Sequence, residues 1–456
     1  MNTTSVAVIR EEFLGFVPVK YDLAAENIAN VILQRCRELG LDLNLMIGQG
    51  YDGCSTMSGK DNGVQARIRR DYGRAIFVHC ASHRLNLVVN DLNEVSQIRN
   101  SIGTIKSVIA YIRDSALRRN AFPNVPLLSE TRWTSKYKSI RLFSENIEEI
   151  YDKLEELSTT LSGKGRARAH ELHSAIKSPV YIISMIIIAT YSAILEPVTQ
   201  SLQATDMDVG KVRQHICTLI GVFQRHRNNA NVQFQPMFER AKTLAEHFGV
   251  LLTIPRKCSK MTQRANYDSN TPEEYYRISL FVPYMDSLIN SLTARFDEQN
   301  EILVSLSSLM PREATQLSRE QYAAHMQKIA NLYALDNFCT QADAWYEMHV
   351  DNQDSMTKAA LDLRNETDFY PAIKQAMLIY LALPATTCAI ERSFSTLRRV
   401  KTWLRSTMTD DRLSGLCMMS VHRREVNEHK QQFMDNVIDT FGSDRRRLQF
   451  LFSENK

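Results

Sequence analysis

The chain has 456 residues, 44% of them hydrophobic, which is enough for about three domains with cores of their own. Its 55 basic and 51 acidic side chains leave a formal net charge of +4, too small an excess to indicate nucleic-acid binding from overall charge. Eight cysteines without a Cys-x-x-Cys pair, and no secretory leader, favour reduced thiols in an intracellular compartment.

Strand and helix patterns alternate near the N-terminus. This alternation predicts an α/β sheet with parallel neighbouring strands. In chain order, the predicted elements cover residues 6–19 (a strand or hairpin arm), 22–39 (a helix ended by Gly40), 43–48 (a strand), 63–72 (a helix) and 75–78 (a strand).

Helical periodicity dominates the middle of the chain. It runs from residue 83 to about 161, with breaks at 122–126 and 129–133. The polar, basic segment 158–170 predicts an exposed loop. Residues 171–340 are almost wholly helical, apart from the segment 255–272.

The uncharged stretch 178–195 just reaches the length of a membrane span. It contains Pro179, Ser184, Thr190 and Ser192, and it has no aromatic or basic flanking pattern. We therefore expect a buried core helix.

Near the C-terminus, the apolar run 372–383 ends at Pro384, and a helix follows. The apolar face of this helix consists of Ile390, Phe394, Leu397 and Val400. Two further amphipathic stretches, 410–423 and 431–441, complete the chain.

Two carboxylates are candidate metal ligands. Asp52 follows a predicted strand inside Gly48-Gln49-Gly50-Tyr51-Asp52-Gly53, where it could also simply close a turn. Glu391 lies in the first turn of its predicted helix, where the helix dipole alone favours a carboxylate. The functional alternative is that the two side chains share a divalent metal ion.

Cys80-x-x-His83 has ligand types suited to zinc, but no second pair stands at a convincing spacing. A structural role at the strand-to-helix junction is the better interpretation. Trp133 lies between Arg132 and Thr134, so it is either an exposed stacking platform for a base or a half-buried core residue.

Taken in order, five segments resemble the transposase-derived proteins of the hAT superfamily, in particular the group that includes the zinc-finger MYM-type proteins. The likeness covers nearly the whole chain. The matching segments are residues 12–16 (EFLGF), 48–53 (GQGYDG), 79–87 (HCASHRLNL), 131–133 (TRW) and 383–395, which runs from LPATT to ERSFS.

The resemblance implies a fold that is α/β with a large all-α insertion, namely an RNase H-like core interrupted by a helical domain. Residues 1–150 would be the first part of a partial RNase H-like core, and 151–370 the helical insertion. Residues 371–456 would hold the final RNase H-like helix and the hAT C-terminal dimerisation region.

The resemblance also implies a catalytic Asp, Asp, Glu set that holds two divalent metals for DNA strand transfer. Asp52 matches the second carboxylate and Glu391 the third. Cys80 and His83 match a Cys-or-Asp-x-x-His motif, and Trp133 matches the tryptophan linked to a flipped base.

The first Asp of the family lies upstream of the segment that resembles residues 6–16. We therefore expect an N-terminally truncated chain that lacks the first strands, the first Asp and any zinc finger. With too few ligands for two ions, it is expected to be inactive and to need no cofactor, whereas Mg²⁺ or Mn²⁺ would serve a complete site. Purified protein should not nick or join a transposon-end duplex.

The leading hypothesis is a domesticated hAT-type protein that forms a homodimer or higher assembly and binds no membrane or small-molecule substrate. The alternative is a fragment of an active DDE-type DNA transposase. The nucleus is expected as its compartment by resemblance. Residues proposed for dimerisation are Leu413, Leu416, Met419 and Phe441.

Residual DNA binding is a third hypothesis, and it predicts a steep salt dependence of binding. The residues that would contact DNA are His83, Arg132, Trp133, Arg256, Lys257 and Arg392, with Lys260 and Arg264 beside them.

Overall fold

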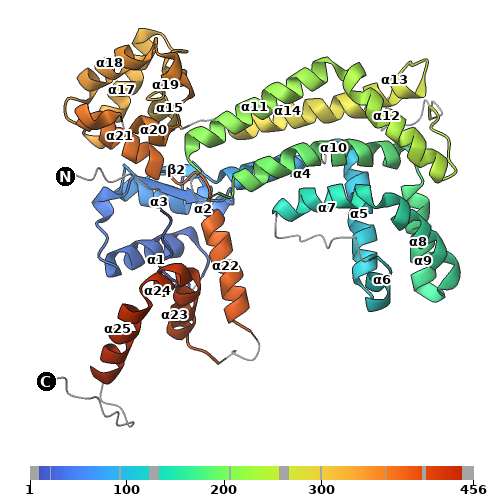
Figure 1. The fold of residues 1–456 in the computed structure, drawn as a ribbon, viewed down its shortest axis with the longest axis horizontal. Coiled ribbons are helices and arrows are strands. Elements are labelled where there is room, and N and C mark those ends of the chain that lie inside the picture. The colour runs from blue at the N-terminus through green and yellow to red at the C-terminus, as the bar shows by residue number, and fades with distance from the viewer. Residues whose placement is uncertain are drawn as a thin grey trace.

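The structure is a computed structural model that describes residues 10–20, 22–91, 94–122, 133–204, 207–255, 267–297, 300–364, 366–402 and 407–443. The side chains of residues 89, 90, 121 and 133–136 lie outside this description as well. Helices dominate the described part. Figure 1 shows a small sheet at the junction of an extended helical arm, a compact helical body and the C-terminal helices.

The N-terminal part alternates helix and strand around a parallel pair, as predicted. Gly48 lies opposite Ile76 and Tyr51 opposite His79 in the pairing of the two strands. A small core that includes Leu33 and Ile68 joins the helices to this unit. Its elements are α1 (Ala25–Glu38), a 3₁₀ turn (Leu43–Leu45), β1 (Gly48–Tyr51), α2 (Ser55–Ser58), α3 (Val64–Asp71) and β2 (Ile76–His79).

Two predicted strands differ from the structure. The Asp42 carboxylate accepts a hydrogen bond from the Asn44 backbone N–H at 2.9 Å, which stabilises a 3₁₀ turn over residues 43–45. Strand β1 therefore begins only at Gly48. Within the predicted strand 6–19, the described residues 10–19 contain no strand. They run instead against the C-terminal helices, where the Phe16 N–H donates to Ser414 Oγ at 3.0 Å.

The glycines of β1 let another segment lie directly on the strand. A Cβ placed at Gly50 would lie 2.8 Å from Pro384 Cγ and 2.9 Å from Pro384 Cβ, and one at Gly48 would lie 2.8 Å from Leu383 Cδ2. Side chains at these positions would exclude the segment. The glycine spacing of the sequence motif therefore reflects the packing of Leu383 and Pro384 on the strand.

The arm is a set of long antiparallel helices with one continuous hydrophobic core that extends from Ala81 to Leu292. Helix α10 packs against α5, α7 and α12, while α14 packs along α4 and α11. The arm helices are α4 (Ala81–Asp91), α5 (Ser96–Arg113), α6 (Ala116–Ala121), α7 (Trp133–Glu145), α8 (Ile147–Thr160), α9 (Gly163–Ile176), α10 (Pro179–Ser201), α11 (Val209–Asn228), α12 (Ala230–His247), α13 (Pro272–Tyr276), a π-turn (Arg277–Phe281) and α14 (Val282–Phe296).

The prediction of a buried core helix over 178–195 is confirmed by α10. Within the described helices only α10 is long and apolar enough to cross a membrane, and 72% of its apolar window is buried in the protein. Its apolar residues lie between neighbouring helices of the arm.

The loop predicted over 158–170 is wrong, because helices occupy most of this segment. Helix α8 continues to Thr160 and α9 begins at Gly163, whose φ of +62° suits a glycine at the turn. Ala169 and Leu172 are buried in the arm core, whereas the polar and basic side chains of this segment occupy the opposite face. Helix α9, which holds most of the segment, is thus amphipathic with a wide polar face.

The compact body has a second core that extends from Leu303 to Leu383 and also contains Ile76 and Val78 of strand β2. One face of β2 is therefore covered by this body. The expected domain boundaries at 150 and 370 stay a prediction. The body contains α15 (Glu301–Ser307), α16 (Pro311–Ala314), α17 (Arg319–Tyr333), α18 (Phe338–His349), α19 (Gln353–Thr357), α20 (Ala360–Arg364), a 3₁₀ turn (Thr367–Phe369) and α21 (Pro371–Ala382).

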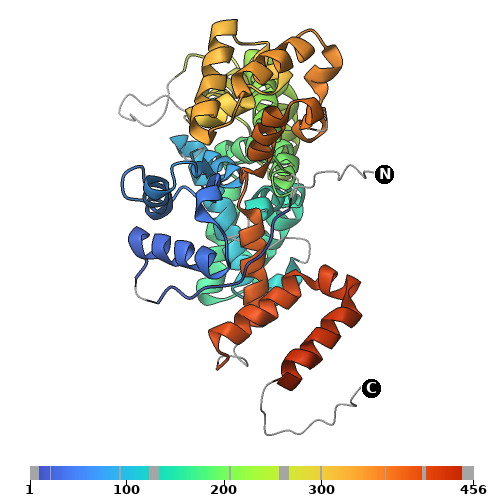
Figure 2. The same ribbon diagram turned by 90° about the vertical axis from the view of Figure 1, so that its left-hand side faces the viewer.

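The C-terminal helices extend away from the sheet, as Figure 2 shows from the side. On the predicted apolar face of the first of them, Ile390 and Phe394 are 51% and 55% exposed. The residues that this helix buries are Cys388, Ser393 and Thr396 instead. The helices are α22 (Cys388–Val400), α23 (Asp410–Val421), α24 (Arg423–Glu428) and α25 (Lys430–Ser443).

Replacing Gly50 with alanine should destabilise the protein by about 1–3 kcal/mol, because the new methyl group overlaps the Pro384 ring. Gly103→Ala is the matched control, since position 103 is inside α5 and has nothing within 4 Å of a new Cβ. That change should stabilise the helix by roughly 0.5–1 kcal/mol. Urea unfolding measures both, and equal effects of the two substitutions would contradict the packing argument.

Candidate functional site

Asp52 lies directly after strand β1, in a turn that its own side chain stabilises. Its Oδ1 accepts a hydrogen bond from the Cys54 N–H at 3.2 Å. Partial burial acts to raise the pKa of Asp52, but the hydrogen bonds from Cys54 and the nearby His83 and His79 rings lower it below its ordinary value. The side chain is thus an ionised turn residue with two imidazoles beside it.

His79, at the end of strand β2, lies beneath this turn. A Cβ at Gly53 would be only 2.7 Å from His79 Nε2, so the glycine permits the turn to approach the ring. The Nε2 atom is buried and makes no hydrogen bond within the described structure. Burial, together with Arg84 and His83, lowers the pKa of His79 to about 4, and Asp52 opposes the shift.

Aromatic rings line the same face of the strands. Phe77 stacks on Tyr51 with centroids 6.1 Å apart and on His79 at the same distance. The ring of His83, in the first turn of α4, lies 5.7 Å from that of His79. The row of flat side chains therefore runs from Tyr51 to His83, and the carboxylate of Asp52 interacts with its two histidines.

Cys80 joins the sheet to the start of α22. Its N–H donates to the Tyr51 carbonyl at 3.0 Å, and its Sγ accepts from the Thr387 N–H at 3.3 Å. Next to it, the Ala81 N–H donates to the Ala385 carbonyl at 3.1 Å. These contacts support the structural interpretation of Cys80 at the strand-to-helix junction.

Cys388 lies behind the same junction. Its Sγ is 3.1 Å from the Ser82 hydroxyl, and both residues are buried. Burial raises the pKa of Cys388 to about 11. The thiol is therefore protonated at neutral pH and serves as a packing group between α4 and α22.

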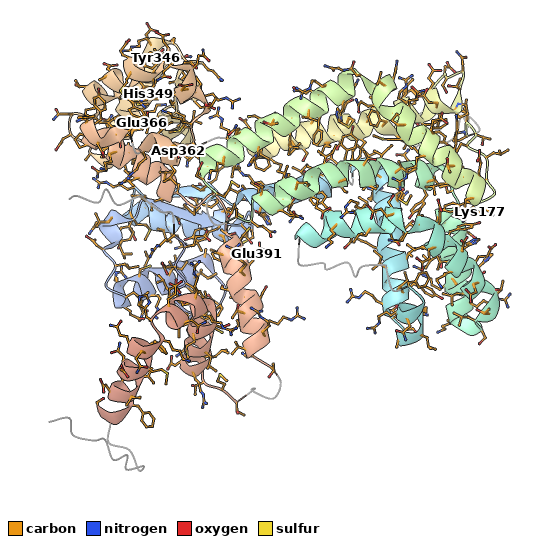
Figure 3. The ribbon with its side chains drawn as sticks, in the orientation of Figure 1. Lys177, Tyr346, His349, Asp362, Glu366 and Glu391 are labelled. Carbon is orange, nitrogen blue, oxygen red and sulfur yellow. The ribbon has the colours of Figure 1, made fainter. Side chains whose placement is uncertain are left out.

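Glu391 is in the first turn of α22, as predicted, and Figure 3 places it at the end of this helix that faces the sheet. Desolvation raises its pKa, against the opposing charge of Arg392. Arg392 itself donates to the Gln203 carbonyl at 2.8 Å and pairs with Glu11 at 3.3 Å.

Among the described residues, the group of three side chains that lies close enough to share a metal ion consists of Glu12, His422 and Glu425, and it includes neither Asp52 nor Glu391. Asp52 and Glu391 also do not contribute to each other's pKa shifts. The proposal that these two carboxylates share a metal ion stays a prediction.

Most of the predicted DNA contacts lie outside the described residues. This applies to Arg132, Arg256, Lys257, Lys260 and Arg264, and to the side chain of Trp133, whose backbone begins α7. Of the other two, His83 is half-buried beside His79, and Arg392 is exposed and paired with Glu11.

The predicted dimerisation residues differ in exposure. Leu413 is buried, Leu416 and Phe441 are half-buried, and Met419 is 49% exposed. Sequence reasoning did not name the neighbours of Phe441 on α25, Phe433, Met434, Val437 and Ile438. Their spacing at one helical face would have identified them.

Comparison with known proteins gives two family matches. The hAT family C-terminal dimerisation region matches residues 354–424, and the RNase-like domain of ZMYM1/FAM200 matches residues 3–63. The chain carries an hAT dimerisation region. The resemblance to hAT transposase-derived proteins is thereby confirmed. The described structure has a two-stranded parallel sheet, so the wider RNase H-like core stays a prediction.

Two curated relatives carry the same name, the 52 kDa repressor of the inhibitor of the protein kinase. The human protein is 23% identical over 461 residues, which cover 95% of this chain and 59% of that protein. The mouse protein is 24% identical over 462 residues, with 95% and 60% covered. The chain therefore spans about 60% of the length of these relatives.

His79 should make stability depend on pH. In the unfolded chain its imidazole takes up a proton near pH 6.5, but in the folded chain only near pH 4. The unfolded state binds more protons between these values, so the free energy of unfolding falls as the pH is lowered from 6.5 toward 4. Because the ring is half-buried, solvent screening reduces the effect.

His79→Gln should flatten this dependence in urea unfolding at pH 7 and pH 5. Other histidines, among them His173 and His349, also have lowered pKa values, so the difference between variant and wild type is the measured quantity. The exposed His170→Gln is the control. A His79 variant with the wild-type pH dependence would refute the assignment.

Proposed function

We propose that this chain acts through self-association of its C-terminal helices, and that an apolar face of α25 forms the contact. The observation that carries the proposal is the exposure of that face. Met434, Val437 and Ile438 are 48%, 49% and 45% exposed. No side chain of α25 is buried against the rest of the described chain.

The apolar residues of α25 follow helical spacing. Phe433, Val437 and Phe441 stand four residues apart, with Met434 and Ile438 beside them, so they share one stripe along the helix. A helix with an exposed stripe of this kind gains roughly 25 cal/mol for every Å² of apolar surface removed from water. A second copy offers the same stripe, as a two-fold dimer requires.

The matched dimerisation region supports self-association and lies directly before this surface in the chain. It ends at residue 424, and α25 begins at Lys430. Further exposed apolar side chains lie within the matched region, namely Ile390, Phe394, Met419 and Val421. The proposed contact therefore follows in sequence a region whose family description names dimerisation.

Association, rather than DNA strand transfer, is the function we assign to this chain. Asp52 accepts a hydrogen bond from a turn N–H, and Glu391 lies beside Arg392. Neither carboxylate belongs to a group of three metal-ligand side chains among the described residues.

DNA binding and a nuclear location are further parts of the proposal. Both draw on the hAT relationship, and the two relatives are named as repressors. The basic side chains that would contact DNA fall mainly outside the described residues, so the proposal for DNA depends on the sequence alone.

Replacing Val437 and Ile438 together with glutamate should convert the assembly to a monomer. Each lost apolar side chain removes roughly 1.5–3 kcal/mol of burial, and carboxylates without partners oppose contact. Gln432→Glu adds a charge on the polar face of the same helix and should leave association unchanged. Multi-angle light scattering of the full chain gives the mass, and an unaltered mass for the double variant would exclude this surface.

A further inference from the structure

The N-terminal segment and the C-terminal helices meet at a cluster of three side chains that are able to bind a metal. Glu12 comes from the segment 10–20, His422 stands between α23 and α24, and Glu425 belongs to α24. One ligand atom from each lies within 4.8 Å of the other two. His422 Nδ1 is 3.2 Å from Glu425 Oε2 and 3.9 Å from Glu12 Oε2.

The backbone fixes which nitrogen of His422 is available. Its Nε2 lies 3.0 Å from the Phe13 carbonyl oxygen, and a carbonyl only accepts hydrogen bonds, so Nε2 carries a proton. Its Nδ1 lies 3.2 Å from Glu425 Oε2, and a carboxylate oxygen also only accepts, so without a metal this nitrogen carries a proton as well. A divalent ion would replace that proton and bind the Nδ1 lone pair, which is directed toward the two carboxylates. Histidines that bind metals in proteins are oriented in this way, with the other ring N–H donated to a carbonyl or carboxylate.

The two carboxylates of the cluster favour a bound cation. Two carboxylates repel each other unless positive charge lies between them. A proton on Nδ1 balances one carboxylate, whereas a divalent ion balances both. The neighbouring Arg424 donates from its Nε to Glu428 Oε1 at 2.8 Å, and its charge also interacts with Glu425 from outside the cluster.

We propose that Glu12, His422 and Glu425 form a divalent-cation site that takes Zn²⁺. An imidazole with two carboxylates suits zinc better than Mg²⁺ or Ca²⁺, which prefer oxygen ligands throughout. Zinc–ligand bonds of about 2.0–2.2 Å place tetrahedral ligand atoms about 3.3–3.6 Å apart. The two distances from His422 Nδ1, 3.2 Å and 3.9 Å, are close to this spacing. The side chains of Glu12 and Glu425 are 52% and 62% exposed, which leaves the fourth position open to water.

Bound zinc would tie the two ends of the described chain together. The segment around Glu12 already touches the C-terminal helices, through the Phe16 N–H to Ser414 and the ring of Phe16 on that of Phe394, with centroids 5.4 Å apart. A cation would link Glu12 to His422. These residues are far apart in the sequence, since Phe13, which follows Glu12, is 409 positions from His422. All three ligands come from one copy of the chain, so the site does not require self-association.

The test is a calorimetric titration with ZnCl₂. The full chain is first freed of metal with a chelator. We expect a saturable site whose affinity falls at least about tenfold in Glu12→Gln, Glu425→Gln and His422→Gln. Glu11→Gln is the matched control, because Glu11 is the next residue but pairs with Arg392. The control should retain wild-type affinity.

Cobalt(II) separates this site from binding to the free cysteines. A site of imidazole and carboxylates gives weak visible bands without the thiolate charge-transfer band, and these bands should disappear in His422→Gln. Equal zinc affinity in wild type and all three variants, thiolate bands alone, or the absence of saturable zinc binding would each overturn the proposal. Absence of binding would mean that a proton, and not a metal, occupies the cluster.

Discussion

The close approach of Leu383 and Pro384 to strand β1 holds the molecule together at its centre. It is possible only because Gly48 and Gly50 lack side chains, and it fixes the start of α22 against the ends of both strands. The helical body ends in the same segment, and the arm begins one residue after Cys80, which accepts from Thr387. The arm, the body and the C-terminal helices therefore all depend on this one junction.

The sequence predicted elements whose patterns are local. The helices near 22–39 and 63–72, the parallel strands and the apolar helix at 178–195 follow from periodicity alone. The strand at 43–48 was misplaced because the Asp42 side chain stabilises a 3₁₀ turn, and the loop at 158–170 because a helix with a wide polar face resembles a loop in composition. Residues 10–19 read as a strand, but their partners are helices distant in sequence.

The candidate site was likewise predictable from the sequence only where its pattern is local. Asp52 and its glycines are recognisable from a short motif, and the order of several motifs indicated the hAT relationship. The packing of Pro384 on Gly50, the bond from Thr387 to Cys80 and the Glu12–His422 contact join residues hundreds of positions apart, and no local pattern encodes them. The apolar stripe of α25 was within reach of sequence reasoning, because only its exposure required the structure.

The position of residues 10–16 along the C-terminal helices has a consequence for multivalency. A binding module attached to this segment would have its attachment point beside the helices proposed to associate, because Phe13 and Phe16 contact those helices. Dimerisation would then bring two such modules near each other. The second would meet a repeated target at a high effective concentration, so a pair of weak binding modules would act with an avidity that neither has alone.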